Sequence, residues 1–293
     1  MILYFKEEFE DNAEFICWKK NNASETIVAV EDADMDKLAK TGYDNCILIA
    51  ASNQSVQFAK DRHMAVLGFQ APESYMGSFL QVDYVIQGFE EIDMVFIDRV
   101  YRRHHGLPWT IAKTDRCLIR ELTLEDMDAL FELYSKPGIT DYVEPLLEYQ
   151  EELEYEKAYI RHMYGYYGYG TWLIFHKESG QLIGRAGLEN KDYTNGGRTV
   201  TFSGQTELEL GYIIAPEYQG QGYATEVCRA IIEFAINETE FDRINCLIDA
   251  ENTASVNLAK KLGFSCVGAS REKSYSGRKV FLDRYCLDIS REL

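Results

Sequence analysis

The sequence predicts an α/β protein in which a small parallel-sheet domain precedes a larger domain with a mixed, mostly antiparallel sheet. Its 293 residues exceed the usual size of about 100–200 residues for one domain, and 46% hydrophobic residues can fill two cores. Before residue 105, strand-like apolar runs alternate with helical patterns, which is typical of a parallel sheet. Beyond residue 117, strand-like runs follow one another around short turns, which favours antiparallel pairing.

Residues 1–105 are expected to form the first domain, and residues 106–116 the linker that leaves it. The linker follows a small basic cluster and is marked by Gly106 and Pro108, which punctuate a chain between regular elements. The elements expected in the first domain are short buried strands at 26–30, 46–50, 64–69 and 83–86, with helices at 35–40 and 55–61.

Residues 44–93 of this domain resemble the later half of a haloacid-dehalogenase-like domain. Phosphatases of that family need an Asp nucleophile in an Asp-x-Asp-x-Thr/Val motif, and residues 31–36 read Glu-Asp-Ala-Asp-Met-Asp, without the Thr or Val. The resemblance therefore implies a degenerate, non-catalytic domain. A magnesium-dependent phosphatase that acts through Asp32 is the alternative, and solvated turn carboxylates are the plainer interpretation of this acidic run.

Residues 117–293 are expected to form the second domain. Thr123, followed by acidic residues, is a capping pattern that opens a helix ending near Tyr134. Strands at 171–176 and 182–188 form a hairpin, and 207–214 pairs antiparallel beside them. The other expected elements are a strand at 118–122, a helix at 149–163, a polar hairpin loop at 190–205, a helix at 226–237, a strand at 244–248, a helix at 255–262, and strands at 265–269 and 280–287.

The most informative stretch of the chain is a Gly-rich turn, Gln-Gly-Gln-Gly-Tyr-Ala-Thr, at residues 219–225. Pro216 ends the strand before it, so Gly220 and Gly222 fall where the next helix begins. Free backbone N–H groups and the positive end of the helix dipole favour an anion there, and the missing Cβ atoms let a phosphate approach. The turn predicts a site for a phosphorylated cofactor.

The spacing separates this turn from other nucleotide-binding motifs. A P-loop needs Lys and then Ser or Thr after its last Gly, whereas Gly222 is followed by Tyr223 and Ala224. A dinucleotide fingerprint needs a third Gly and an acidic residue about 20 residues on that closes a strand. Asp242 lies at that distance, but it opens the next apolar run instead.

Three blocks of the sequence fit one family better. Gln219, Gly222 and Ala224 match the pattern Gln/Arg-x-x-Gly-x-Gly/Ala; residues 210–219 precede it, and Asn-x-x-Ser at 252–255 runs into Lys-Leu-Gly-Phe. With these blocks, residues 117–289 resemble the GNAT family of acyl-CoA-dependent N-acetyltransferases, and within it the branch of ribosomal-protein N-terminal acetyltransferases. The resemblance implies acetyl-CoA as cosubstrate, with contacts at Tyr212, Ile213, Ile214, Gln219, Gly220, Gln221, Gly222, Tyr223, Ala224, Thr225 and Asn252.

The resemblance also implies direct attack of an amine on the thioester, without a covalent enzyme intermediate. Pantetheine is expected to lie along the strand 210–214 where it splays from the strand at 244, with an N–H near Ile214 facing the thioester oxygen. The alternative is that the two strands pair throughout.

Catalysis requires a base that takes up the proton of the attacking amine. The resemblance implies that this base is an acidic residue of the strand 207–214, which acts through a water molecule. Glu207 and Glu209 share a face, and Glu209 is preferred because it lies nearer the splay. Many GNAT members carry a Tyr as general acid where this chain has Ala259, so Ser255 or a water held by Asn252 is expected to substitute. Solvent exposure for the glutamates and helix capping for Asn252 and Ser255 are the alternatives.

The acceptor is expected to be an amine that is not identified by the sequence: a peptide N-terminus, a polyamine, an amino sugar or an amino acid. Its pocket is expected beside the Tyr-rich stretch 159–172, whose aromatics could face a cation or simply pack on the hairpin. The rival function is an acyl-CoA-binding sensor that has lost transfer, which the Ala259 position suggests.

The composition of the chain limits which partners and which cellular compartment we expect. A formal charge of −18 argues against a general nucleic-acid partner and is compatible with a cationic acceptor. No apolar run approaches the roughly 18 residues of a membrane span, and the acidic N-terminus is unlike a signal peptide, so a cytoplasmic location without membrane contact is expected. The seven scattered cysteines are expected to be reduced thiols. The spacing of the five histidines predicts no metal site. The sequence leaves open whether the chain forms a homodimer.

Overall fold

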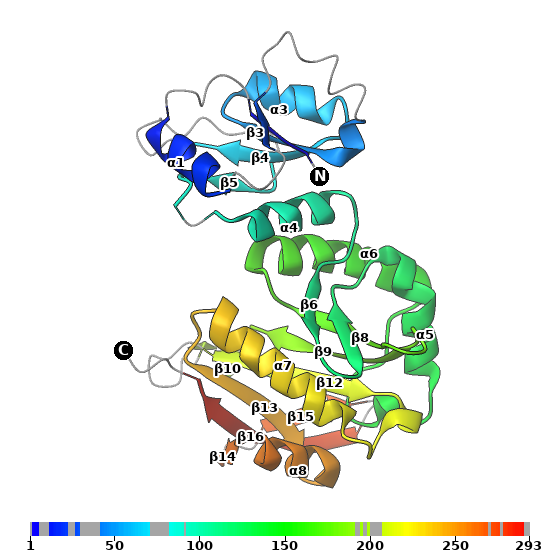
Figure 1. Ribbon diagram of the computed structural model, residues 1–293. Helices are drawn as coiled ribbons and strands as arrows, with labels where there is room; N and C mark the ends of the chain where they lie inside the picture. The colour runs from blue at the N-terminus through cyan, green and yellow to red at the C-terminus, as the bar shows by residue number, and fades with distance from the viewer. Residues whose placement is uncertain are drawn as a thin grey trace. The chain divides into compact units, whose positions relative to one another are not determined.

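The protein forms two compact units, Met1–Trp109 and Thr110–Leu293, in the computed structural model (Figure 1). The structure describes residues 2–5, 12–22, 27–29, 42–70, 82–90, 92–190, 194–195, 198–199, 207–268, 271–275 and 278–289.

The first unit contains the expected parallel sheet, with strands in the order β2-β1-β3-β4-β5. Its central strand is buried on both faces: Ile47 and Ile49 pack with α1 and α4, while Leu48 packs with α3. This double burial explains why the strand reads as a continuous apolar run. The elements are β1 Ile2–Phe5, α1 Ala13–Asn21, β2 Ile27–Ala29, β3 Cys46–Ala50, α3 Asn53–Lys60, β4 Ala65–Phe69, β5 Val85–Ile86 and α4 Met94–His104.

Three elements of this unit were not expected from the sequence: β1, α1 and α4. The basic residues next to the expected linker belong to the last turn of α4, where they complement the helix dipole. Asp93 caps the start of this helix by accepting the N–H of Phe96 at 2.7 Å. The helix expected at 35–40 and the acidic run 31–36, including Asp32, lie outside the described residues.

The second unit is built on one sheet in the order β14-β16-β13-β12-β9-β8-β7-β6, with β15 paired to β16. All neighbours are antiparallel except β12 and β13, which confirms the expected mixed sheet. The strands are β6 Thr110–Lys113, β7 Cys117–Arg120, β8 Thr171–His176, β9 Leu182–Glu189, β12 Glu207–Ile214, β13 Arg243–Asp249, β14 Ser265–Cys266, β15 Arg271–Tyr275 and β16 Arg278–Asp288.

Helices of this unit cover the sheet through apolar faces. Figure 1 shows α7 lying against the sheet of this unit. Its buried side chains, among them Val227 and Ile231, belong to the same core cluster as Leu208 and Ile244 of the central strands. The helices are α5 Met127–Ser135, α6 Tyr149–Tyr159, α7 Tyr223–Glu238 and α8 Thr253–Lys261.

Some elements differ from the expectation. The range expected as linker, 106–116, contains β6, which pairs with β7. The helix expected at 149–163 is α helical only to Tyr159 and continues as a π-helical segment, Ile160–Tyr167. Of the expected loop 190–205, the structure describes Asn190 and the short antiparallel pair β10 Thr194–Asn195 and β11 Arg198–Thr199.

The two central strands diverge, as expected. β12 pairs with β13 at only three positions, from Glu207 opposite Arg243 to Glu209 opposite Asn245. Beyond them β12 continues to Ile214 against β9, while β13 continues to Asp249 against β16. The sheet therefore opens between β12 and β13 at the ends that precede α7 and α8. Among the described residues, no helix is long and apolar enough to cross a bilayer.

Candidate active site

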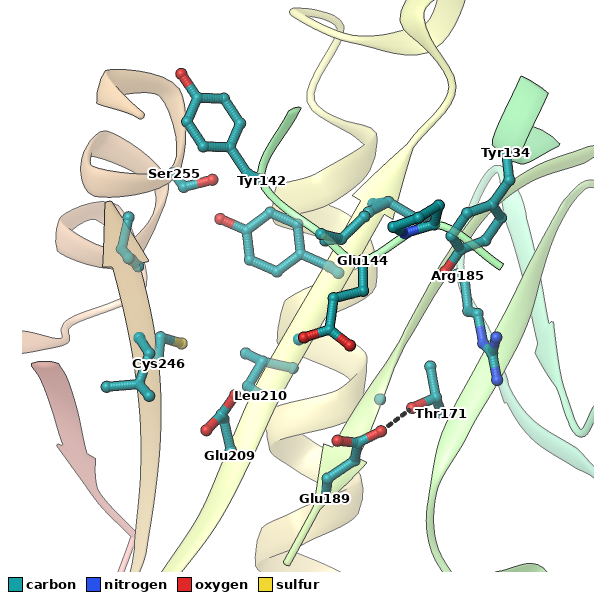
Figure 2. Close-up of a pocket in the computed structure, with 18 of the residues that line it drawn as sticks. Tyr134, Tyr142, Glu144, Thr171, Arg185, Glu189, Glu209, Leu210, Cys246 and Ser255 are labelled. Carbon is teal, nitrogen blue, oxygen red and sulfur yellow. Dashed lines mark hydrogen bonds between the residues drawn. The ribbon is translucent and has the colours of Figure 1, made fainter. Parts of the chain in front are cut away.

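A cavity of about 860 Å³ lies where β12 and β13 diverge (Figure 2). Residues 209–213 of β12 form one wall, residues 246–249 of β13 another, and Asn252 and Ser255 at the start of α8 border it. The remaining lining comes from the segment 142–147, from α5 and α6, from β8, from β9 and the Asn190 that follows it, and from Leu282 of β16.

The divergence exposes backbone groups of β12 to this cavity. Leu188 of β9 donates its N–H toward β8, to Gly170, at 3.0 Å. Its antiparallel partner Leu210 therefore directs its own groups away from β9, and the same holds for alternate residues Tyr212 and Ile214. These groups face the gap left by β13, where an extended ligand with amide groups can pair like an added strand.

The Gly-rich turn leads directly into α7. Gly220 and Gly222 have φ angles of 70° and 87°, left-handed conformations that glycine adopts without strain. Gly222 is the N-cap residue and has no side chain to cap the helix, and the first helical bond runs from the Glu226 N–H to the Gly222 carbonyl at 3.1 Å. The N–H groups before Glu226 therefore make no hydrogen bond within the helix, which is the arrangement that a phosphate site requires.

The space beside the two glycines of the turn is open. A Cβ built on Gly220 would meet no atom within 4 Å, and one on Gly222 would meet only the Arg116 guanidinium, at 3.6 Å. The expected cofactor residues 220–225 thus form an open backbone cradle at a helix N-terminus.

Side chains around the turn fix its shape. Gln219 donates to the carbonyl of Ile214 at 2.8 Å, and Gln221 donates to the carbonyl of Glu217 at 2.7 Å. Arg116, which the sequence reasoning missed, donates to the carbonyl of Gln221 at 3.0 Å and to the carboxylate of Glu226 at 2.7 Å. These side chains hold the turn, and Arg116 adds positive charge beside it.

The two glutamates expected as bases have different surroundings. Glu209 lines the cavity. Glu207 lies where β12 still pairs with β13, and its buried carboxylate forms ion pairs with Arg284 and, at 3.4 Å, with Arg243. Neighbouring strands β13 and β16 bring these arginines to Glu207, so of the two glutamates it is Glu209 that lines the cavity.

Hydroxyl groups also border the divergence. Asn252 caps α8 by accepting the N–H of Ser255 at 3.1 Å, and both residues line the cavity as well. The Tyr212 hydroxyl is buried close to Ser255; burial raises its pKa, and the interaction with Ser255 opposes that rise. Ala259 is 3% exposed and packs in the core, so this position offers no group to the cavity.

The Tyr-rich stretch contributes less to the cavity than expected. Of the Tyr-rich stretch 159–172, Thr171 is the described residue that lines it. Tyr159 and Tyr164 are buried instead: the Tyr159 hydroxyl accepts the N–H of Thr171 at 2.7 Å, and Tyr164 donates to the Thr171 carbonyl. The rings of these two tyrosines pack in the core, and their hydroxyls hold the backbone of Thr171, which lines the cavity.

The segment 142–147, which lacks any helical or strand period, lines the cavity along its whole length and was missed in the sequence. Glu152 of α6 holds it by accepting the N–H of Leu147 at 2.8 Å. Figure 2 shows Tyr142 and Glu144 of this segment at the cavity, across from Glu189 and Glu209.

A buried ion pair lies beside this wall. Arg185 of β9 donates to Glu156 of α6 at 2.8 Å, with side-chain exposures of 10% and 0%. Burial raises the pKa of Glu156, and the attraction of Arg185 opposes that rise. Among the residues that the structure describes, no group of His, Cys, Asp and Glu is arranged to hold a metal ion.

Comparison with known proteins gives a consistent result. A model described as "Acetyltransferase (GNAT) domain" matches residues 116–265. The uncharacterized protein YkkB of Bacillus subtilis is 31% identical over 151 residues, which are 51% of this chain and 82% of YkkB. The uncharacterized N-acetyltransferase YoaA of the same species is 28% identical over 169 residues, 56% of this chain and 88% of YoaA.

A solved structure shows the same fold. It is that of RimL, a ribosomal L7/L12 alpha-N-protein acetyltransferase in complex with coenzyme A, with a TM-score of 0.51 and 16% identity. The similarity covers 61% of this chain and 98% of that one.

Proposed function

Since the chain belongs to the GNAT family and is an acetyl-CoA-dependent N-acetyltransferase, we propose that a primary amine attacks the thioester directly in the cavity between β12 and β13. The observation that carries this proposal is the continuity of three features. The gap beside Leu210–Ile214, the Gly220–Thr225 cradle that follows it, and Glu209 at the start of the gap lie along one stretch of chain.

The cradle binds the diphosphate of coenzyme A through backbone N–H groups, and the exposed edge of β12 pairs with the pantetheine amides. Acetyl-CoA supplies the activated acyl group and a thiolate leaving group. The N–H of Ile214 stabilises negative charge that develops on the thioester oxygen, because it is fixed in place before the reaction.

Glu209 takes up the proton of the amine through water, since an amine is mostly protonated at neutral pH and cannot attack in that form. Ser255 holds a proton for the departing thiolate. The Tyr212 hydroxyl borders the same cavity and serves as a second donor at this position. These hydroxyls supply the general acid that Ala259 cannot provide.

Two measurements test the proposal together: calorimetry with acetyl-CoA, and release of free thiol from acetyl-CoA with a panel of amines. The panel includes peptide N-termini, because RimL acts on a protein N-terminus. We expect binding of acetyl-CoA, slow thiol release without an amine, and faster release with an accepted amine that gains one acetyl group by mass spectrometry. Binding without thiol release for every amine would show a sensor instead of an enzyme.

A further inference from the structure

We propose that the acceptor lies on Gly211 of β12, so that the size of the side chain at this position determines which amines the enzyme acetylates. This inference rests on the proposed function, because it takes Glu209 as the base for the attacking amine.

The first observation is that the two faces of β12 serve different parts of the site. Leu210 belongs to the core cluster that contains the buried face of α7, and Tyr212, on the same face as Leu210, lies close to Ser255 of α8. Glu209 and Gly211 alternate with these residues and therefore lie on the opposite face of the strand. An acceptor that has to reach Glu209 approaches from that face, while the hydroxyl groups proposed for the thiolate lie on the other.

The second observation is that Gly211 is an exposed position within the sheet. It lies directly opposite Gly187 of β9, and both glycines line the cavity. All eight residues of β12 are described, and Gly211 is the exposed one among them. Thr171 and Glu189, which share this face of the sheet, border the same cavity (Figure 2). The described parts of the chain therefore leave the backbone of Gly211 open to the cavity.

The third observation is that no contact of the described residues requires a glycine at position 211. A Cβ on the other three glycines in described strands would meet an atom at 3.3 Å for Gly68, 2.4 Å for Gly184 and 2.0 Å for Gly187. A Cβ on Gly211 would meet no atom within 4 Å, and its φ angle is not in the left-handed region. Glycine weakens the interior of a strand, and it often marks a place where a ligand approaches the backbone closely.

The position of Gly211 relative to Glu209 fits this role. Residues two apart on a strand are separated by about 7 Å on the same face. An acceptor in contact with the Gly211 backbone therefore has room for its amine and one water molecule before the Glu209 carboxylate, which acts through water in the proposed mechanism. A side chain at position 211 fills the same space and competes with the acceptor.

The experiment substitutes Gly211 by alanine and by valine and measures thiol release from acetyl-CoA. The amines are a tetrapeptide that begins with serine, spermidine, glucosamine and threonine, one for each class of acceptor that the sequence leaves open. For every amine that the wild type acetylates, we expect kcat/KM to fall about tenfold in Gly211→Ala and further in Gly211→Val, since one extra carbon in a pocket changes kcat/KM by roughly 10- to 200-fold.

Three further measurements separate the acceptor from other causes. Both variants bind acetyl-CoA with the wild-type dissociation constant by calorimetry, because the backbone of β12 is unchanged. They also keep the slow thiol release without an amine, since water is small enough to reach the thioester. The melting temperature of Gly211→Ala equals or exceeds that of the wild type, because alanine fits a strand backbone without strain. Alanine carries the test if Gly211→Val does not fold.

The matched control is Gly180→Ala. Gly180 lies between β8 and β9, is not among the described residues lining the cavity, and would also carry a Cβ that meets no atom within 4 Å. Its φ angle of 69° is left-handed, however, so a side chain there is strained. Gly180→Ala therefore lowers the melting temperature and leaves kcat/KM unchanged, which is the reverse of the pattern expected for Gly211→Ala.

Three results overturn the proposal for Gly211 and leave acetyl transfer intact. They are an unchanged kcat/KM in both Gly211 variants, a loss that is matched by weaker binding of acetyl-CoA, and a loss that is matched by a lower melting temperature of Gly211→Ala. Absence of thiol release with every amine, in a wild-type protein that binds acetyl-CoA, overturns the proposed function itself.

Discussion

Glu207 and Glu209 lie two residues apart on one strand, but their surroundings differ. The three paired positions of β12 and β13 keep Glu207 among the arginines of β13 and β16. Glu209 is the last paired residue, and the divergence beyond it leaves its side chain at the cavity. The alternation of a strand places both on one face, but only the tertiary structure shows that Glu207 pairs with two arginines and that Glu209 lines the cavity.

We therefore predict opposite effects for two matched substitutions. Glu209→Gln should lower kcat at least tenfold, since general bases contribute roughly 10²- to 10⁴-fold, with unchanged affinity for acetyl-CoA and unchanged stability. Glu207→Gln should instead weaken a buried ion pair, lower the melting temperature and leave kcat of the folded enzyme nearly intact. Steady-state kinetics, calorimetry and thermal unfolding of both variants check this. Equal losses of kcat would remove the distinction between the two residues.

At the scale of elements, the start of α5 shows how local chemistry fixes a helix end. The Asp126 carboxylate accepts the backbone N–H of Thr123 at 2.8 Å and forms an ion pair with Arg120 at 2.7 Å. Burial by itself raises the pKa of Asp126, but the hydrogen bonds from Arg120 and Thr123 outweigh it and hold the pKa below its usual value. A capping pattern visible in the sequence therefore becomes an ion-paired N-terminus that also anchors β7.

This cap gives a pH-dependent prediction. Because the folded pKa of Asp126 is lowered, its stabilisation is complete above the unfolded value near 4 and is lost as the pH falls through the folded value. Asp126→Asn should therefore reduce the free energy of unfolding by about 1–3 kcal/mol at pH 7, and by less at pH 3. Urea unfolding of the wild type and the variant at both pH values measures the difference. A penalty that is equal at the two pH values would mean that the charge does not matter.

Elements with a clear period could be predicted from the sequence. The strands 171–176 and 207–214 have the expected bounds because their apolar runs end at Gly or Pro. The segment 142–147 and Arg116 could not be identified, since their importance comes from contacts with distant parts of the chain. The end of α6 was also missed, because buried tyrosines fix the π-helical segment and no local signal marks it. The Gly-rich turn could be placed at the start of α7 because its glycines are required by backbone geometry within one short turn.

At the scale of the whole molecule, the site and its supporting core belong to one unit. Every described residue that lines the cavity, the cradle, and the core cluster around Trp172 falls within Thr110–Leu293. The first unit has core clusters of its own, around Ile47 and Leu48. Binding of acetyl-CoA should therefore need the second unit alone.

We predict that a fragment of residues 110–293 binds acetyl-CoA with the dissociation constant of the full chain and releases thiol at the same rate. Ligand at about 100 times its dissociation constant should stabilise either protein by about 2.7 kcal/mol, because it binds only the folded site. Calorimetry and thermal unfolding of both proteins provide the test. A fragment that folds but binds more weakly would show that the first unit contributes to the site.

The divergence of β12 and β13 has one more consequence for the second unit. Its sheet consists of two leaves, β14-β16-β13 and β12-β9-β8-β7-β6, and the direct backbone ladder between them spans only three residue pairs. The site proposed for acetyl-CoA lies at the open end, between the two leaves. A donor bound there would contact both leaves and would help to fix the angle between them, so the substrate would brace the sheet that binds it.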